Sequence, residues 1–132
     1  KAHKMNVQVA MQQYRQVGNH SSAEDASPHK LILMLLTGAQ ERIATAKTHM
    51  VNGNIAAKGE TIGTAMNIIV GLRASLDHDK GGAISSNLDA LYEYMEKRLF
   101  DANLKNDPAI LEEVSNLLKE ITSAWAGIAD QI

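Results

Sequence analysis

Four long stretches of this sequence repeat their apolar residues every three or four positions, and this periodicity constrains the fold more than any other feature. The spacing places the apolar side chains of each stretch on one face of an α-helix. No segment alternates with a period of two over a useful length, so we do not expect strands. The four apolar stripes consist of Ile32, Leu35, Leu36, Ala39, Ile43, Ala46 and Met50; of Ile55, Ile62, Ala65, Met66, Ile69, Leu72 and Leu76; of Ile84, Leu88, Leu91, Met95, Leu99 and Ala102; and of Ile110, Leu111, Val114, Leu117, Leu118, Ile121, Trp125 and Ile128.

Capping and breaking residues mark where these helices begin and end. Ser27-Pro28 and Asp107-Pro108 each place a capping side chain before a proline, which is favoured at the first helical position. Asn52-Gly53 supplies residues that tolerate the left-handed conformation after a helix, and Gly81-Gly82 interrupts the chain a second time. The sequence therefore predicts helices over residues 28–51, 55–77, 83–105 and 108–128.

The predicted helices have similar lengths and short connections, a combination typical of antiparallel neighbours. We therefore expect an all-α fold, an antiparallel up-down four-helix bundle that occupies residues 27–130. Residues 1–26 have a weaker apolar pattern, interrupted by a loop-like cluster from Gly18 to Ser22. We expect this segment to form an N-terminal leader that packs on the bundle as a cap.

Charge and composition exclude several classes of function. The formal net charge is −2 and no run of Lys or Arg is present, which argues against a nucleic-acid partner. The longest uncharged stretch is too short to cross a bilayer, so we expect no membrane insertion and no targeting segment. The chain has no cysteine, which suits a reducing compartment and favours a cytoplasmic location.

Residues that could support catalysis or metal binding do not form a known pattern, so we expect no catalytic residues, no metal and no cofactor. The five histidines lack the spacing of a helical metal site. Asp77, Asp79 and Gly81 resemble the start of a calcium loop, but Leu88 occupies the position that needs a bidentate Glu. An alternative is a histidine phosphotransfer module, another four-helix signalling fold, although His49 lies in the last turn of the first predicted helix and His78 lies in a loop.

The first three helices carry more apolar residues than one stripe needs. Residues outside the stripes are Leu33 and Met34 in the first helix, Ile68 and Val70 in the second, and Tyr94, Phe100 and Leu104 in the third, with Tyr92 at the edge of its stripe. A helix that is apolar on more than one face has more than one surface to bury. The leader could cover this surplus, or it could dock an amphipathic helix of a partner. Both hold if the leader is a displaceable lid.

Several stretches, taken in order, resemble the flagellar secretion chaperone family, FliS. The resemblance runs nearly the whole chain, and its most specific part is the block that begins at Lys80-Gly81-Gly82 and continues through the third helix. The similar stretches are Tyr14–Val17, Ala26–Ile32, Ala57–Glu60, Ala65–Ile69, Leu72–Asp77, Lys80–Ile84, Asn87-Leu88, Leu91-Tyr92, Tyr94-Met95, Arg98-Leu99, Ala102-Asn103 and Trp125.

This resemblance implies a cytosolic export chaperone, not an enzyme, that binds the disordered C-terminal region of flagellin. The chaperone would prevent premature polymerisation and deliver flagellin to the flagellar type III secretion apparatus, with its export gate as a second partner. We expect a monomer or a weak dimer. From the exposed apolar positions, their neighbours and the leader, the expected partner-binding residues are Tyr14, Leu33, Met34, Ile68, Val70, Asn87, Tyr92, Tyr94 and Arg98.

Overall fold

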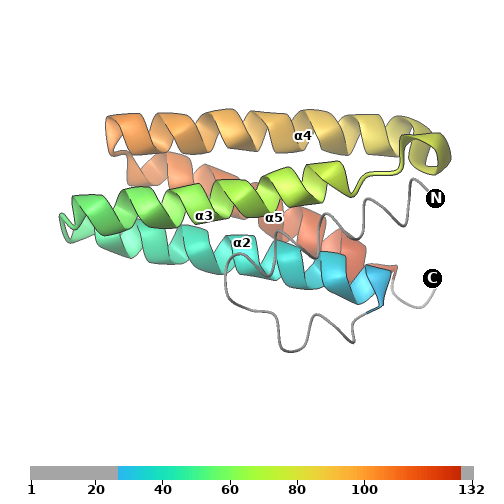
Figure 1. Cartoon of the computed structure of the whole chain (residues 1–132), viewed down its shortest axis with the longest axis horizontal. Helices are drawn as coiled ribbons and strands as arrows, with labels where there is room; N and C mark the ends of the chain where they lie inside the picture. The colour runs from blue at the N-terminus through green and yellow to red at the C-terminus, as the bar shows by residue number, and fades with distance from the viewer. Residues whose placement is uncertain (1–26, 129–132) are drawn as a thin grey trace.

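The computed structural model describes residues 27–128, and within that range the chain forms four α-helices and no strand (Figure 1). The helices are α2 (Pro28–Val51), α3 (Ile55–Ala74), α4 (His78–Lys105) and α5 (Pro108–Gly127). The predicted all-α four-helix bundle is therefore confirmed. The expected leader, with Tyr14, lies outside the described residues.

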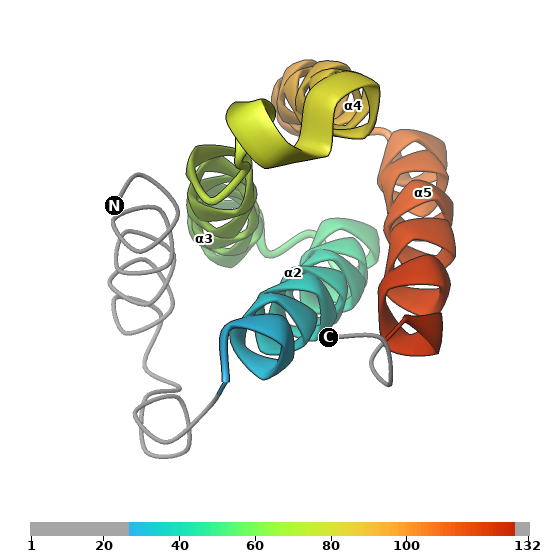
Figure 2. The same cartoon turned by 90° about the vertical axis from the view of Figure 1, so that its right-hand side faces the viewer.

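Each helix packs beside the next one along the chain, and α5 returns beside α2 (Figures 1 and 2). Contacts between helix ends give the directions. His29 at the start of α2 meets Trp125 at the end of α5, and Lys58 near the start of α3 meets Asn103 near the end of α4. Neighbouring helices consequently run in opposite directions around the bundle.

The predicted caps form at both Ser-Pro and Asp-Pro boundaries. The Ser27 side chain accepts a hydrogen bond from the Lys30 amide at 3.2 Å, and the Asp107 side chain accepts one from the Ala109 amide at 3.0 Å. These bonds satisfy amides that have no partner within the first turn of a helix. They explain why the starts of α2 and α5 agree with the sequence prediction.

The boundary between α3 and α4 differs from the prediction. The first of these helices ends at Ala74 instead of residue 77, and α4 begins at His78 instead of residue 83. Asp77 caps a turn that precedes the glycine pair, and Gly82 then kinks the helix with a φ of 52°. A Cβ at Gly81 would lie 1.8 Å from Ser85 Oγ, so this kink requires glycine there.

The core between the four helices is aliphatic, as expected from a chain with only 4% aromatic residues. Its fully buried large side chains are Leu31, Leu35, Leu36, Ile43, Ile62, Ile68, Ile69, Leu72, Met95, Leu99, Leu111 and Leu118. Two residues placed in the predicted stripes are exposed instead, Ile55 at 59% and Ile84 at 71%. Ile55 lies one turn before Lys58, which contacts the C-cap of α4, and Ile84 precedes Asp89, which contacts the end of α3. Each therefore lies beyond the end of the helix that would have covered it.

Two residues expected outside the stripes or at their edge are buried. Ile68 is 0% exposed, so the prediction of an exposed side chain was wrong. It lies three residues after Ala65 and four before Leu72, both buried, because α3 packs against α2 and α4 and buries a wider sector than one stripe. Tyr92 is 3% exposed and shares its sector of α4 with Met95 and Leu99. Burial raises the pKa of the Tyr92 hydroxyl, because the phenolate would lose its hydration.

Polar side chains connect the helices around this core. Glu113 of α5 accepts hydrogen bonds from the Tyr94 hydroxyl and from Arg98 Nε, the latter at 2.8 Å. The hydrogen bond from Tyr94, followed by the one from Arg98, holds the pKa of Glu113 below its usual range. At the other end of the bundle the rings of His29 and Trp125 stack with centroids 4.9 Å apart, and Trp125 Nε1 donates to the His29 carbonyl.

We expect Leu35→Ala to lower the free energy of unfolding by about 2–5 kcal/mol, because the change leaves a cavity in a fully buried site. Urea denaturation followed by circular dichroism measures the loss. Thr37→Ala on the exposed side of α2 is the matched control and should change stability by no more than about 0.5 kcal/mol. Equal effects of the two changes would contradict the assignment of the core.

We expect Glu113→Gln to destabilise the bundle at neutral pH and to have little effect in acid. Because its pKa is lowered in the folded chain, the ionised carboxylate adds stability above its unfolded-state pKa. That contribution is lost as the pH falls through the lower folded-state pKa. Denaturation of both proteins across this range, with Glu120→Gln as a control, measures the difference. A difference that does not depend on pH would disprove the proposed origin of the pKa shift.

Candidate functional site

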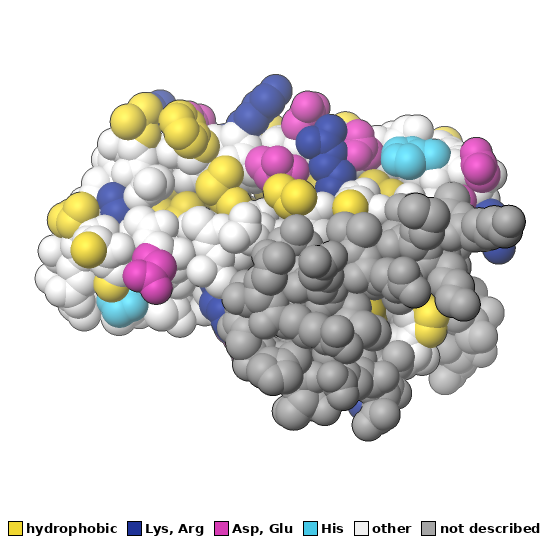
Figure 3. Space-filling model, viewed as in Figure 1, with side chains coloured by type: hydrophobic (Ala, Val, Ile, Leu, Met, Phe, Trp, Pro, Cys, Tyr) yellow, Lys and Arg dark blue, Asp and Glu magenta, His cyan; other side chains and the backbone are white. Residues whose placement is uncertain are grey.

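Most of the large apolar side chains that remain exposed lie on α4, and the others lie on α3 and at the end of α2. Within residues 27–128 they are Val51, Ile55, Val70, Ile84, Tyr94, Phe100 and Leu104. Figure 3 shows hydrophobic side chains gathered over one end of α4 and along its boundary with α3. Exposed apolar surface of this kind is typical of sites that bind another protein.

Contacts between α3 and α4 define a continuous surface, which we call the α3–α4 face. It consists of Gly59, Gly63, Val70 and Arg73 of α3 and of Asp89, Glu93, Glu96, Phe100 and Leu104 of α4. At one end Arg73 pairs with Glu96, and at the other a Cβ on Gly59 would contact Asn103 at 3.9 Å. Gly63 and Phe100 lie between these two contacts along their helices, which places them near each other on this face.

The α3–α4 face is apolar and open toward the C-terminal end of α4. Phe100 is 60% exposed and Leu104, one turn later, is 71% exposed. Val70 on α3 is 42% exposed and lies one turn before Arg73, where the apolar part of the face meets its charged part. A Cβ added at Gly63 would meet no atom within 4 Å, so the surface beside Phe100 has room for a side chain of a partner.

The other half of the α3–α4 face is charged. Arg73 Nε donates to Asp89 Oδ1 at 2.6 Å, and the guanidinium lies 3.5 Å from both Glu93 and Glu96. The hydrogen bond from Arg73 holds the pKa of Asp89 below its usual range, and the same bond raises the pKa of Arg73. These pairs fix the register of α3 against α4 while leaving the apolar half uncovered.

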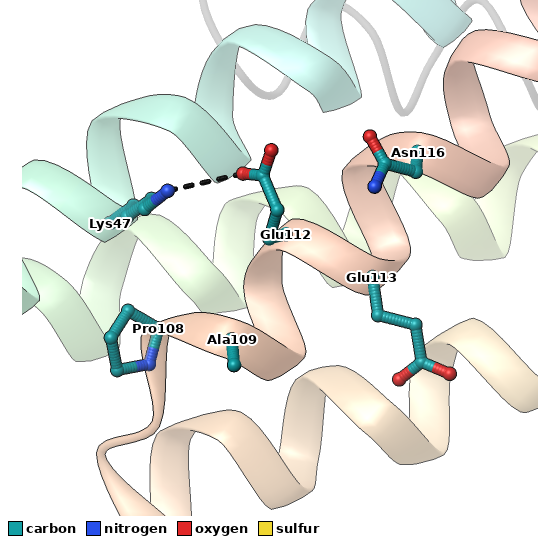
Figure 4. Close-up of a pocket in the computed structure, with 6 residues that line it drawn as sticks. All are labelled: Lys47, Pro108, Ala109, Glu112, Glu113 and Asn116. Atoms are coloured by element: carbon teal, nitrogen blue, oxygen red, sulfur yellow. Dashed lines mark hydrogen bonds and ion pairs between the residues drawn. The ribbon is translucent and has the colours of Figure 1, made fainter.

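Tyr94 and Arg98, both predicted site residues, lie on the opposite edge of α4. They face α5, where both donate to Glu113. Figure 4 shows the Glu113 side chain directed from α5 toward α4. The Tyr94 side chain is therefore held in place by its hydroxyl, while the residue as a whole remains 41% exposed. The structure brings these two residues together but separates them from Val70.

The remaining predicted residues have different environments. Leu33 and Met34 are partly buried on α2, and Asn87 is exposed on α4. Ile68 and Tyr92 lie in the core and present almost no surface to a partner. The predicted set thus divides among several surfaces instead of forming one.

Phe100 and Leu104 contribute more exposed apolar surface than any predicted site residue, although they were not predicted to bind a partner. Their positions outside the apolar stripe of α4 were visible in the sequence. Their spacing of four residues was the further signal, because it places both on one edge of the helix. The contact of that edge with α3 comes only from the structure.

A shallow depression of about 550 Å³ lies between the end of α2 and the start of α5. Figure 4 shows Glu112 turned toward Lys47, to which it pairs at 3.1 Å, on the side away from Glu113. The lining residues are Lys47, Pro108, Ala109, Glu112, Glu113 and Asn116. Its acidic groups bind cationic or hydroxyl donors of neighbouring helices, so the depression offers no free pair of carboxylates for acid–base chemistry.

The histidines of the described segment do not have the exposed mid-helix position of a phosphotransfer site. His29 is stacked on Trp125, and Nδ1 of His49 is shielded from solvent near the end of α2. His78 is exposed but is the first residue of α4. Over residues 27–128, no group of three or more His, Asp or Glu side chains could hold a metal ion. None of the helices there has the length and apolar character to cross a membrane.

Comparison with known proteins relates this chain to one family. The family model described as "Flagellar protein FliS" matches residues 10–132. The flagellar secretion chaperone FliSB of Pseudomonas aeruginosa is 48% identical over 125 residues, which cover 95% of this chain and 99% of that protein. The FliS chaperones of Salmonella typhimurium and Vibrio cholerae are 47% and 45% identical and each covers 88% of this chain, with 87% and 85% of their own lengths matched. The chain therefore belongs to the FliS family of flagellar secretion chaperones.

Proposed function

We propose that this protein is a cytosolic export chaperone that binds the disordered C-terminal region of flagellin. Binding prevents premature polymerisation and delivers the client to the flagellar type III secretion apparatus. The relatives are named as flagellar secretion chaperones, which supports the export role. The observation that carries the proposal for this chain is the exposed apolar half of the α3–α4 face.

The α3–α4 face suits a client that is disordered on its own. Phe100, Leu104 and Val70 project from rigid helices, so they are already in position before the client arrives. A segment that folds on binding must bury enough apolar surface to offset the cost of ordering it. An amphipathic helix meets this requirement by burying one apolar side on the face and leaving its polar side in water.

Other parts of the bundle provide secondary contacts in this proposal. A client that wraps around the chaperone reaches the exposed ring of Tyr94, with Arg98 beside it, and the exposed Asn87 at the other end of α4. Leu33 and Met34 on α2, and Tyr14 in the leader, remain further candidates. Release follows from handover to another binder, because binding of this kind needs no nucleotide.

We expect a C-terminal fragment of flagellin from the same organism to co-purify with the full chain. The mixture should show more helical circular dichroism than the sum of its components, because the fragment folds as it binds. Titration calorimetry should give a negative heat-capacity change, the signature of apolar burial. A fragment from the flagellin N-terminus is the control. No binding at micromolar concentrations would rule out the chaperone role.

We expect Val70→Glu to weaken binding of the flagellin fragment at least tenfold, because a carboxylate would lose its hydration against the apolar client. Thermal unfolding should change little, since Val70 is 42% exposed in the free protein. Asn116→Glu, on the exposed side of α5, adds the same charge away from the α3–α4 face and should leave affinity unchanged. A large drop in melting temperature would mean that Val70 is needed for the core and not for the client.

A further inference from the structure

Lys58 is the one buried charged residue within residues 27–128. The residue is 5% exposed and lies near the start of α3, as its fourth residue. No carboxylate of residues 27–128 forms an ion pair with it. A buried ammonium without a carboxylate is costly unless other groups stabilise its charge.

The end of α4 supplies those groups. Lys58 Nζ donates to the Asn103 carbonyl at 3.1 Å and to Asn106 Oδ1 at 3.1 Å. The last carbonyls of a helix carry the negative end of its dipole, so they attract a cation. Lys58 therefore acts as a C-terminal cap that α3 provides for α4.

This cap serves groups that the backbone leaves without a partner. The amides of Asn106 and Asp107 both reach the Ala102 carbonyl, and the next carbonyl, that of Asn103, accepts from Lys58. Asn106 also adopts a left-handed conformation with a φ of 54°, which is uncommon outside glycine. The bond from Lys58 to its side chain holds that conformation in place.

The segment held in this way carries the most exposed apolar residues of the α3–α4 face. Leu104 directly follows Asn103, and Phe100 lies one turn before it. The final turn of a helix frays readily when its carbonyls lack partners. A frayed end would have to be ordered again whenever a client bound to it, which lowers affinity.

We propose that Lys58 is a positioning residue for client binding: by capping α4 from α3, it keeps Phe100 and Leu104 as a rigid apolar edge of the α3–α4 face. This inference rests on the proposed function, because it assumes that the flagellin segment uses this face. Lys58 does not touch the client. It acts through the order of the last turn of α4.

Lys58→Met tests this role, because methionine retains a buried apolar stem and removes the donor. Hydrogen exchange of the amides of residues 104–107 should become at least tenfold faster than in the wild type, while the middle of α4 stays protected. Affinity for the flagellin C-terminal fragment should fall roughly tenfold. Lys58→Arg, which keeps a cationic donor, should retain much of the exchange protection and much of the affinity. The control is Lys119→Met, which changes an exposed lysine on α5 and should alter neither the exchange rates nor the affinity.

Each outcome separates this inference from the proposed function. If the wild type fails to bind the fragment, the proposed function itself is wrong. If the wild type binds, and Lys58→Met binds equally well despite faster exchange at residues 104–107, then Lys58 is only structural and the inference is overturned. Unchanged exchange in that variant would overturn it as well.

Asn106 provides a second test in case Lys58→Met does not fold. Asn106→Gly removes the side-chain acceptor and still permits the left-handed conformation, so the bundle should remain folded. We expect a smaller increase in exchange and a smaller loss of affinity, because the bond from Lys58 to the Asn103 carbonyl persists. Asn106→Asp gives Lys58 a carboxylate partner and should bind the fragment at least as tightly as the wild type. Weaker binding by Asn106→Asp than by Asn106→Gly would contradict the inference.

Discussion

Burial of aliphatic side chains between four helices is the interaction on which the rest of this structure depends. With one Trp, one Phe and three Tyr in the chain, the core relies on Leu, Ile, Met and Ala. Each helix contributes a stripe to the same core, and packing of these apolar faces supplies most of the stability of the helices. The rigidity of the α3–α4 face follows from this shared core, because Phe100 and Leu104 extend from a helix whose other side is buried.

Polar contacts then set how the packed helices are aligned along one another. Arg73 joins α3 to the first half of α4, and Lys58 joins α3 to its end. Glu113 connects α5 to α4 through Tyr94 and Arg98. These contacts lie at the surface or at helix ends, where each contributes little to stability compared with the core. Their value is in register, since a helix that slipped by one turn would move the exposed apolar residues relative to each other.

The candidate site was only partly predictable, for reasons that individual residues illustrate. Val70 was expected outside the core and is exposed, because it lies on the outer edge of α3, one turn before Arg73, and not on the side that faces the core. Ile68 was also expected outside the core but is buried. A single apolar stripe fits a helix that packs against one neighbour, whereas α3 packs against both α2 and α4. Tyr94 is exposed, yet its hydroxyl is committed to Glu113, a residue 19 positions away that periodicity does not connect with it.

Local patterns by themselves determined the helices, because hydrogen bonds within a helix, capping side chains and apolar spacing all act over a few residues. Ser27, Asp107 and the apolar stripes were therefore sufficient to place α2 and α5 and to predict an all-α bundle. Tertiary structure alone decided which surplus apolar residues stay exposed, since that depends on where each neighbouring helix ends. It also decided the role of Lys58, whose partners lie 45 and 48 residues away. A lysine in a helical sequence is ordinarily a solvated residue, and only the packing of α3 against the end of α4 makes it a cap.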